Sequence, residues 1–306
     1  MLLKERYRLC VLDFLNKTWL KSPKRPSAPP PVYRSDRVWF DTRAVAGGRA
    51  PAIVLSPTKT VRHPVVLVTP DIYGITTTLL DAAIRFAREG FEVLIPDIGK
   101  TDGFGLSDHL SLRAGRTLRG GVPVSSAKVA RLVALYRDAL AHLVAREMVD
   151  PNRAAVFGVS YGGALALAVA AESTALSAVA LAYPVPVAPQ GLPGLVTAPL
   201  FAIRGDGDRL AERAERQLKT SSAGATATFR TVPRARHGFL SRDLRAYRVE
   251  LAEPAWEEIV AFLKARLMPP PPAPPPPPSR QAAVAVSPAT VPRPSSSGVA
   301  SPAGPA

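Results

Sequence analysis

Apolar and polar residues follow two alternating patterns along residues 38–268. Some segments are short runs of consecutive apolar residues, which are typical of strands buried on both faces of a sheet. Others repeat apolar residues every three or four positions, which is typical of amphipathic helices. Because the two kinds alternate, we predict an α/β fold with a mostly parallel central sheet and helices on both faces. The predicted strands are 38–40, 52–55, 64–68, 91–95, 154–157, 176–182, 199–203 and 225–232, and the predicted helices are 76–89, 126–148, 164–171, 209–219 and 254–267.

The segments on either side of this region differ from it in composition. Residues 1–37 mix apolar with charged side chains and then become rich in Pro, Lys and Arg, so we expect a basic segment followed by a linker. They hold no uninterrupted apolar stretch, so neither a secretory signal nor a membrane span is predicted, and contact with a membrane surface is the less favoured alternative. Residues 269–306 are dominated by Pro, Ala and Ser without periodicity, which predicts a disordered tail. The predicted division is therefore 1–37, 38–268 and 269–306.

The apolar run 154–157 leads into the sequence Gly158-Val159-Ser160-Tyr161-Gly162. This G-x-S-x-G pattern lies between a predicted strand and a predicted helix, which is the context of a nucleophile elbow. In such an elbow the serine sits on a strained turn with its hydroxyl exposed, and the glycines let strand and helix approach closely. An ordinary glycine-rich turn with an exposed serine would show the same letters. The context, together with the partners described next, favours Ser160 as a nucleophile.

A serine hydroxyl needs a base to take its proton and an acid to orient that base. In α/β-hydrolases these groups follow in the order Ser, then Asp or Glu, then His. One histidine follows Ser160, and this residue, His237, lies between the last predicted strand and the last predicted helix. Asp206 and Asp208 follow the next-to-last strand; we favour Asp208 as the acid, with Asp206 as the alternative. Structural interpretations also exist, since His237 could be a surface histidine and Asp208 the N-cap of the next helix.

Composition and charge narrow the class of protein. Of the 306 residues, 47% are hydrophobic, which is enough for a full globular core. The formal net charge is +15, but much of the excess lies in the flanking segments and the rest lacks interleaved aromatic residues, so no nucleic-acid partner is expected. The single cysteine, Cys10, excludes an internal disulfide and favours a reducing, cytoplasmic compartment. His63, His109 and His142 precede Ser160 without metal-ligand spacing, so we expect no metal and no cofactor.

The chain resembles the dienelactone hydrolase family of α/β-hydrolases over approximately residues 38–267. The matching segments are 70–75 (PDIYGI), 90–97 (GFEVLIPD), 158–163 (GVSYGG), 205–208 (GDGD) and 236–239 (RHGF). The resemblance implies an α/β-hydrolase fold. It also implies that Asp208 is the acid and His237 the base of a catalytic triad.

Further site residues follow from the resemblance alone. It implies an oxyanion hole formed by the backbone N–H groups of Tyr161 and Ile72, while the Tyr161 side chain is expected to pack. Two positions depart from the family, because Ser160 replaces its typical cysteine and Asp71 replaces its usual glutamate. A carboxylate can prepare a thiolate in advance, whereas an alkoxide cannot be stored. We therefore expect His237 to act as a plain general base and Asp71 to shape its loop or order solvent.

Arginines near the expected mouth of the site suggest an anionic substrate, because a guanidinium offers bidentate geometry to a carboxylate. In an arginine-rich chain some of them would lie there by chance. The favoured substrate contacts are Arg113 and Arg242, with Asp71 in the same region. The full set of candidates is Arg236 and Arg242 beside His237, and Arg113, Arg116 and Arg119 in the long connection 99–123.

These observations together predict a serine hydrolase. We expect it to cleave a small ester, lactone or thioester through an acyl-Ser160 intermediate. A serine peptidase or acyl-peptide hydrolase is an alternative, because G-x-S-Y-G-G also resembles the prolyl-oligopeptidase family. A non-catalytic interaction module that binds partners through its proline-rich tail is a second alternative. The sequence leaves the oligomeric state open.

Overall fold

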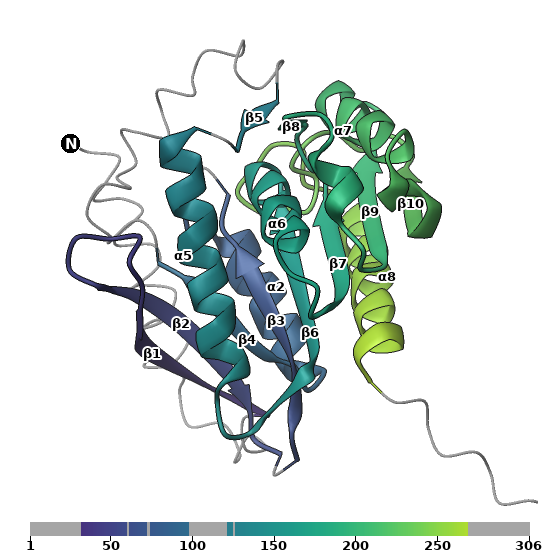
Figure 1. Ribbon diagram of the computed structural model, residues 1–306. Coiled ribbons are helices and arrows are strands. Elements are labelled where there is room, and N and C mark those ends of the chain that lie inside the picture. Colours follow the sequence, from purple (N-terminus) through teal and green to yellow (C-terminus); the bar gives the residue numbers. More distant parts are fainter. Residues whose placement is uncertain (1–31, 60, 72–73, 98–120, 125, 269–306) are drawn as a thin grey trace, which may run out of the picture. The chain divides into compact units, whose positions relative to one another are not determined.

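The computed structural model describes residues 32–59, 61–71, 74–97, 121–124 and 126–268. Its centre is an eight-stranded sheet in the order β1-β2-β4-β3-β6-β7-β9-β10 (Figure 1). β1 pairs antiparallel with β2, and β2 with β4, whereas the other neighbours are parallel. The strands are β1 (Tyr33–Asp41), β2 (Arg49–Pro57), β3 (His63–Thr69), β4 (Glu92–Pro96), β6 (Val149–Val159), β7 (Leu176–Ala182), β9 (Leu200–Gly205) and β10 (Ala227–Val232).

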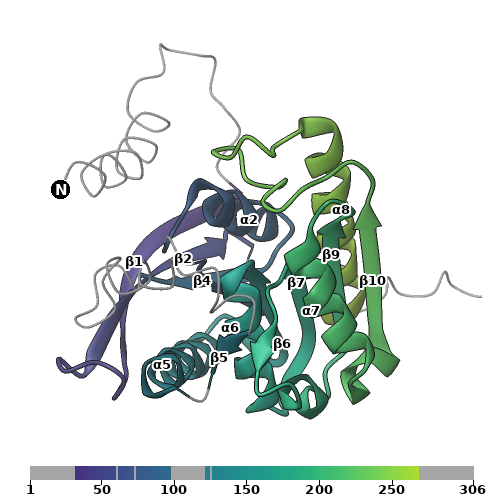
Figure 2. The same ribbon diagram turned by 90° about the horizontal axis from the view of Figure 1, so that it is seen from above.

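Helices cover both faces of this sheet, and the predicted α/β architecture is confirmed (Figure 2). Apolar residues of α5 and α6 belong to one buried cluster, and those of α2 and α8 belong to a second. Strand β3 contributes to both, with Val65 in the first cluster and Val66 in the second, because successive strand side chains point to opposite faces. This explains why the run 64–68 is apolar throughout. The helices are α2 (Thr77–Arg88), α5 (Ala127–Val144), α6 (Tyr161–Ala171), α7 (Arg209–Lys219) and α8 (Val249–Leu267).

The sheet begins earlier than predicted. Strand β1 starts at Tyr33 rather than residue 38, and Tyr33 pairs with Pro57 of β2. Its first five residues are mostly exposed and polar, so they carry no hydrophobic signal, and pairing with β2 determines their conformation. The other residues of the predicted segment 1–37, apart from Val32, and the predicted tail 269–306 lie outside the described residues. No helix in the described part is both long and apolar enough to cross a membrane.

The last helix also begins earlier than predicted. Pro254 is favoured in the first turn of a helix, which is why the pattern predicted a start there. In the structure α8 begins at Val249 and Pro254 lies inside it. A proline at this position removes the bond that its nitrogen would donate to the carbonyl of Glu250. Several short elements carried no signal in the sequence at all: the paired strands β5 (Val122–Pro123) and β8 (Val187–Ala188), and the 3-10 turns η3 (Leu192–Leu195) and η4 (Ser222–Thr226).

Candidate active site

Ser160 occupies the sharp turn between β6 and α6. Its backbone has φ 53° and ψ −117°, a conformation that an L-residue rarely adopts. Such a residue stores about 1–3 kcal/mol of strain and persists only where its surroundings fix it. Two backbone hydrogen bonds fix it: the Ser160 N–H donates to the Ala182 carbonyl at 3.0 Å, and the Ser160 carbonyl accepts from the Val185 N–H at 3.2 Å. The predicted strand–turn–helix context is therefore present, with the serine at the point of strain.

Two glycines make this turn sterically accessible. A Cβ at Gly158 would lie 2.4 Å from the Gly162 carbonyl oxygen, and a Cβ at Gly162 would lie 2.3 Å from the Thr69 carbonyl oxygen. Real Cβ atoms do not approach backbone so closely, so β6, α6 and the end of β3 could not meet with side chains at these positions. The Thr69 hydroxyl reinforces the contact by donating to the Gly162 carbonyl at 2.7 Å.

Ser160, His237 and Asp208 form a continuous chain of hydrogen bonds. The Ser160 Oγ lies 2.9 Å from His237 Nε2, and His237 Nδ1 lies 2.7 Å from Asp208 Oδ2. A carboxylate accepts only, so Nδ1 carries the proton and Nε2 accepts from the serine hydroxyl. The side chain of Asp208 is 2% exposed and that of His237 is 36% exposed, so the acid is buried while the base reaches the surface.

Parallel strands bring these groups together. Asp208 follows β9 and His237 follows β10, and the carboxyl ends of neighbouring parallel strands meet at one edge of a sheet. The two loops touch, since a Cβ at Gly205 would lie 2.2 Å from the Ala235 carbonyl oxygen. The alternative acid, Asp206, is exposed, and its backbone N–H donates to the Val232 carbonyl at 3.0 Å. Of the two aspartates, Asp208 is the one bonded to His237 in the described structure.

Tyr183 is a site residue that the sequence patterns did not reveal. It directly follows β7, is 2% exposed, and has a positive φ of 37°. Its ring meets the His237 imidazole edge to face, with centroids 5.0 Å apart and planes at 65°. Burial raises the pKa of the Tyr183 hydroxyl well above its usual value, and the charges of Asp71 and Asp208 raise it further, so the side chain is neutral. Its place at the carboxyl end of a buried strand was the signal that could have identified it.

The expected oxyanion donors are only partly described. Tyr161 is the first residue of α6, so its backbone N–H is one of those left without an intrahelical partner at the helix start. Its side chain is 2% exposed within the core, and burial raises its pKa to about 12, in keeping with the expected packing role. The second expected donor, Ile72, lies outside the described residues, as do Arg113, Arg116 and Arg119. Asp71 follows β3, and its carbonyl accepts from the Gly74 N–H at 3.0 Å.

A sequence model of the dienelactone hydrolase family matches residues 50–267, which is more than half of the chain. The chain belongs to the dienelactone hydrolase family. The predicted family is thus confirmed, and the protein is a hydrolase of this type.

Similar proteins bear related names. A Bradyrhizobium protein provisionally named 2-oxo-3-(5-oxofuran-2-ylidene)propanoate lactonase is 26% identical over 245 residues, which cover 75% of this chain and 94% of that protein. A Yersinia pestis protein provisionally named carboxymethylenebutenolidase is 25% identical over 228 residues, covering 70% and 83%. A crystal structure of a provisionally named dienelactone hydrolase from Klebsiella pneumoniae has a TM-score of 0.60 and 22% identity, covering 75% and 98%, and supports the fold.

The expected substrate contact Arg242 is already paired in this family member. Its Nε lies 3.0 Å from Asp81 Oδ2 on α2, and its Nη2 lies 3.9 Å from Glu253 Oε1 on α8. Burial raises the pKa of Asp81, while Arg242 and Arg85 lower it, and the net shift is upward. Arg242 thus links two helices, and binding a substrate carboxylate would require it to leave these partners.

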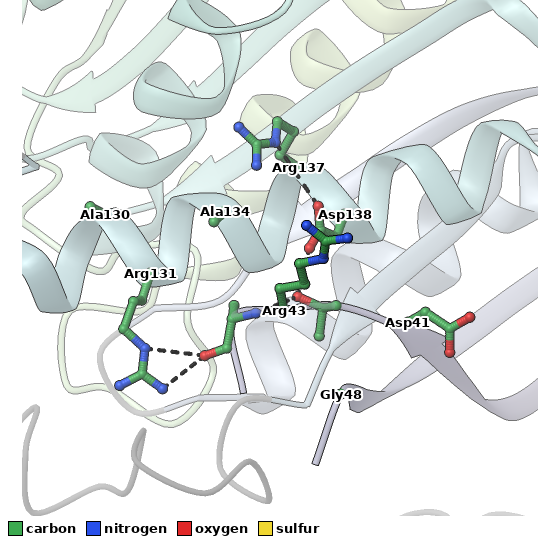
Figure 3. A pocket seen from close by; sticks show the side chains of 10 residues that line it. Asp41, Arg43, Gly48, Ala130, Arg131, Ala134, Arg137 and Asp138 are labelled. Atoms are coloured by element: carbon green, nitrogen blue, oxygen red, sulfur yellow. Dashed lines mark hydrogen bonds and ion pairs between the residues drawn. The ribbon is translucent and has the colours of Figure 1, made fainter. Parts of the chain in front are cut away.

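A pocket of about 760 Å³ lies between the β1–β2 connection and α5 (Figure 3). Its polar groups bond largely to one another. The Thr42 hydroxyl donates to Asp138 Oδ2 at 2.7 Å, and Arg131 donates to the Ala44 carbonyl at 3.1 and 2.8 Å. Strands β1 and β2 lie at the opposite end of the sheet order from β9 and β10, which lead into the acid and base loops. This pocket is therefore remote from the loops that carry Asp208 and His237.

The histidines that precede Ser160 are placed away from this chemistry. His63 Nε2 lies 3.0 Å from the Lys59 carbonyl oxygen, and His142 packs against Phe40 with ring centroids 6.1 Å apart. His109 lies outside the described residues. Among the described side chains, no group of three or more His, Cys, Asp or Glu is arranged to hold a metal ion.

Proposed function

We propose that the protein is a serine hydrolase that cleaves a small carboxylic ester, lactone or thioester through an acyl-enzyme on Ser160. The observation that carries the proposal is the hydrogen-bonded chain from Ser160 through His237 to Asp208, at 2.9 and 2.7 Å. Membership of the dienelactone hydrolase family supports hydrolysis, and the lactonase name of the Bradyrhizobium relative supports a lactone among the substrates.

The first half of the reaction forms the acyl-enzyme. The Ser160 Oγ attacks the substrate carbonyl carbon while His237 Nε2 accepts the hydroxyl proton. Asp208 keeps the other imidazole proton on Nδ1 and stabilises the imidazolium that forms. The backbone N–H of Tyr161, at the positive end of α6, donates to the oxyanion that develops on the carbonyl oxygen.

The acyl-enzyme is complete when the bond from the acyl carbon to the leaving oxygen or sulfur breaks and His237 gives its proton to that atom. With a lactone the new hydroxyl stays attached to the acyl chain. A water molecule then loses a proton to His237 and attacks the acyl carbon, and the serine oxygen leaves with the returned proton. One water is consumed and the carboxylic acid is released.

The decisive experiment detects the intermediate. The protein is mixed with 4-nitrophenyl acetate, quenched, digested and examined by mass spectrometry, with Ser160→Ala as the matched control. We expect one acetyl group on the peptide that contains Ser160 and none on the variant, whose turnover should fall by several orders of magnitude. Near-native turnover by a folded Ser160→Ala protein would contradict the proposal.

A substrate panel separates the alternatives. Esters, lactones and thioesters should be hydrolysed in preference to aminoacyl 4-nitroanilides, and the reverse order would favour a peptidase. A substrate carboxylate is tested by comparing kcat/KM for an anionic ester and its neutral isostere at low and high salt. A true anion site prefers the charged ester, and this preference shrinks as salt screens the charges.

A further inference from the structure

A second pocket, of about 500 Å³, lies on the acid side of the His237 imidazole. The described residues that line it come from the loop after β9, the start of α7, the loop after β10 and the segment before α8. They include Asp208 and His237 but not Ser160, which bonds to the opposite nitrogen of the imidazole. The ring and its carboxylate partner therefore lie between this pocket and the serine.

Three arginines give this pocket a strong positive charge. Arg209, Arg236 and Arg245 line it and are exposed, and within the described part of the chain the structure shows no ion pair for any of them. Arg216, further along α7, is by contrast paired with Glu212 at 2.7 Å. Like charges held close together repel one another unless a counter-charge intervenes. The cluster thus concentrates positive charge at one place, which favours the binding of an anion.

The pocket's one carboxylate offsets only part of this positive charge. Asp208 Oδ1 accepts from the backbone N–H groups of Leu210 and Ala211 at 3.1 and 3.0 Å, and Oδ2 accepts from His237. Both carboxylate oxygens are therefore occupied by donors other than the arginines. The start of α7 lies at the same wall, and the positive end of its dipole adds to the attraction for an anion.

We propose that this pocket binds a multivalent oxyanion of the phosphate class, either free or as the phosphoryl group of a larger molecule, at a site separate from the ester site. Guanidinium groups offer paired N–H donors that match two oxygens of one phosphate, and three arginines can engage a group with several charged oxygens. The volume admits more than a single phosphate, so the first probe is pyrophosphate.

A bound anion should also affect ester hydrolysis. This expectation rests on the proposed function, whereas anion binding itself does not. The three guanidinium charges beside His237 oppose the imidazolium that forms during acylation, and a bound anion offsets them. Pyrophosphate should therefore raise kcat for a neutral ester without raising KM. Competitive inhibition would overturn the separation of the two sites.

Binding is measured directly on the full chain, by calorimetric titration with pyrophosphate at constant ionic strength. Arg245→Met should weaken binding about tenfold or more, because a charge-assisted hydrogen bond contributes about 1.5–3 kcal/mol. Arg88→Met removes an equal charge from the end of α2 and should leave binding within about twofold. No binding by the parent protein, or equal weakening by both variants, would overturn the proposal.

Two further arms complete the test. Phenyl phosphate that binds more tightly than inorganic phosphate indicates an organic phosphoryl ligand, and the reverse order indicates the free anion; both support an oxyanion site. Calorimetry does not depend on turnover. If the protein binds pyrophosphate but does not cleave esters, the proposed function is wrong and the anion site is still supported. Loss of esterase chemistry and loss of anion binding are thus separate results.

Discussion

Asp208 bonds to His237 with one carboxylate oxygen and caps helix α7 with the other. Oδ2 lies 2.7 Å from His237 Nδ1, while Oδ1 accepts from Leu210 and Ala211 at the start of the helix. The two interpretations that the sequence left open, N-cap and acid partner of the histidine, are therefore compatible. One buried side chain fixes the helix and the imidazole together, so a change at this position acts on stability and on activity by different routes.

Asp208→Asn separates these two roles. Asparagine is as good an N-cap as aspartate, so the free energy of unfolding should change little. A carboxamide cannot stabilise the imidazolium or hold the productive tautomer as a carboxylate does, so kcat should fall on the order of 10³–10⁴-fold. Steady-state hydrolysis of 4-nitrophenyl acetate and a thermal melt of the same sample measure the two effects.

The controls are Asp208→Ala and Asp206→Asn. Alanine removes the cap as well, so it should lose about 0.5–2 kcal/mol of stability in addition to the activity. Asp206 is exposed and lies outside the hydrogen-bonded chain, so Asp206→Asn should keep kcat within about threefold. A larger loss in Asp206→Asn than in Asp208→Asn would transfer the acid role to Asp206.

The ring of Tyr183 should hold the His237 imidazole in position. Tyr183→Phe keeps the edge-to-face contact and should retain most of kcat/KM. Tyr183→Leu removes the ring, and a displaced catalytic base can lower the rate by about 10²-fold. Comparing the two variants on a neutral ester, after melts show both to be folded, separates ring packing from general destabilisation. Equal losses in both would assign the effect to the hydroxyl instead.

Much of this architecture is readable from the sequence because it depends on short-range rules. The continuous apolar run of β3 indicated a strand buried on both faces, and the apolar repeat of α5 indicated an amphipathic helix. Such signals predicted both the fold class and the order of the elements. Ser160 could be singled out because the turn needs Gly158 and Gly162, where any side chain would collide with backbone. A steric requirement of this kind is visible in the sequence as glycine at fixed positions.

The remaining features depend on contacts between distant segments. The start of β1 is set by pairing with β2, because residues 33–37 themselves have no apolar pattern. The contact of Tyr183 with His237 joins the ends of β7 and β10, and the pairing of Arg242 with Asp81 joins the last loop to α2. No periodicity or local motif encodes these distances, because each partner satisfies its own local rules without the other.

Glu215 on α7 should make the fold acid-sensitive. Burial raises the pKa of its carboxyl, but hydrogen bonds from Lys219 and Arg204 outweigh this effect and leave the pKa below its usual value. The folded state therefore binds this proton less readily than the unfolded chain. Its contribution is present above the unfolded pKa of 4.5 and is lost as pH falls through the lower folded value.

Glu215→Gln tests this contribution. The variant should be less stable than the parent by about 1–3 kcal/mol near neutral pH, and the difference should shrink below about pH 4. Urea unfolding at several pH values measures it. Glu212→Gln, which breaks the exposed pair with Arg216, is the control and should cost less than about 1 kcal/mol. A difference that stays constant into acid would show that packing, not charge, is what the substitution removes.

The strained backbone at Ser160 should lower the free energy of unfolding of the protein. Ser160→Ala and Ser160→Gly both remove the nucleophile, but alanine keeps the unfavourable φ of 53° whereas glycine adopts it freely. Relief of about 1–3 kcal/mol of strain exceeds the entropy of about 0.5–1 kcal/mol that glycine loses on folding. Both variants should be inactive, and the glycine variant should be the more stable by about 1 kcal/mol in urea unfolding.

A matched pair of substitutions excludes a general effect of glycine. Ser177 lies within strand β7, where glycine should be less stable than alanine by about 0.5–1 kcal/mol. The sign of the Gly-against-Ala difference should therefore reverse between positions 177 and 160. A reversal would show that the strain is specific to the turn at Ser160. If the glycine variant is the less stable one at both positions, the Ser160 backbone stores no energy and its geometry serves only to expose the hydroxyl.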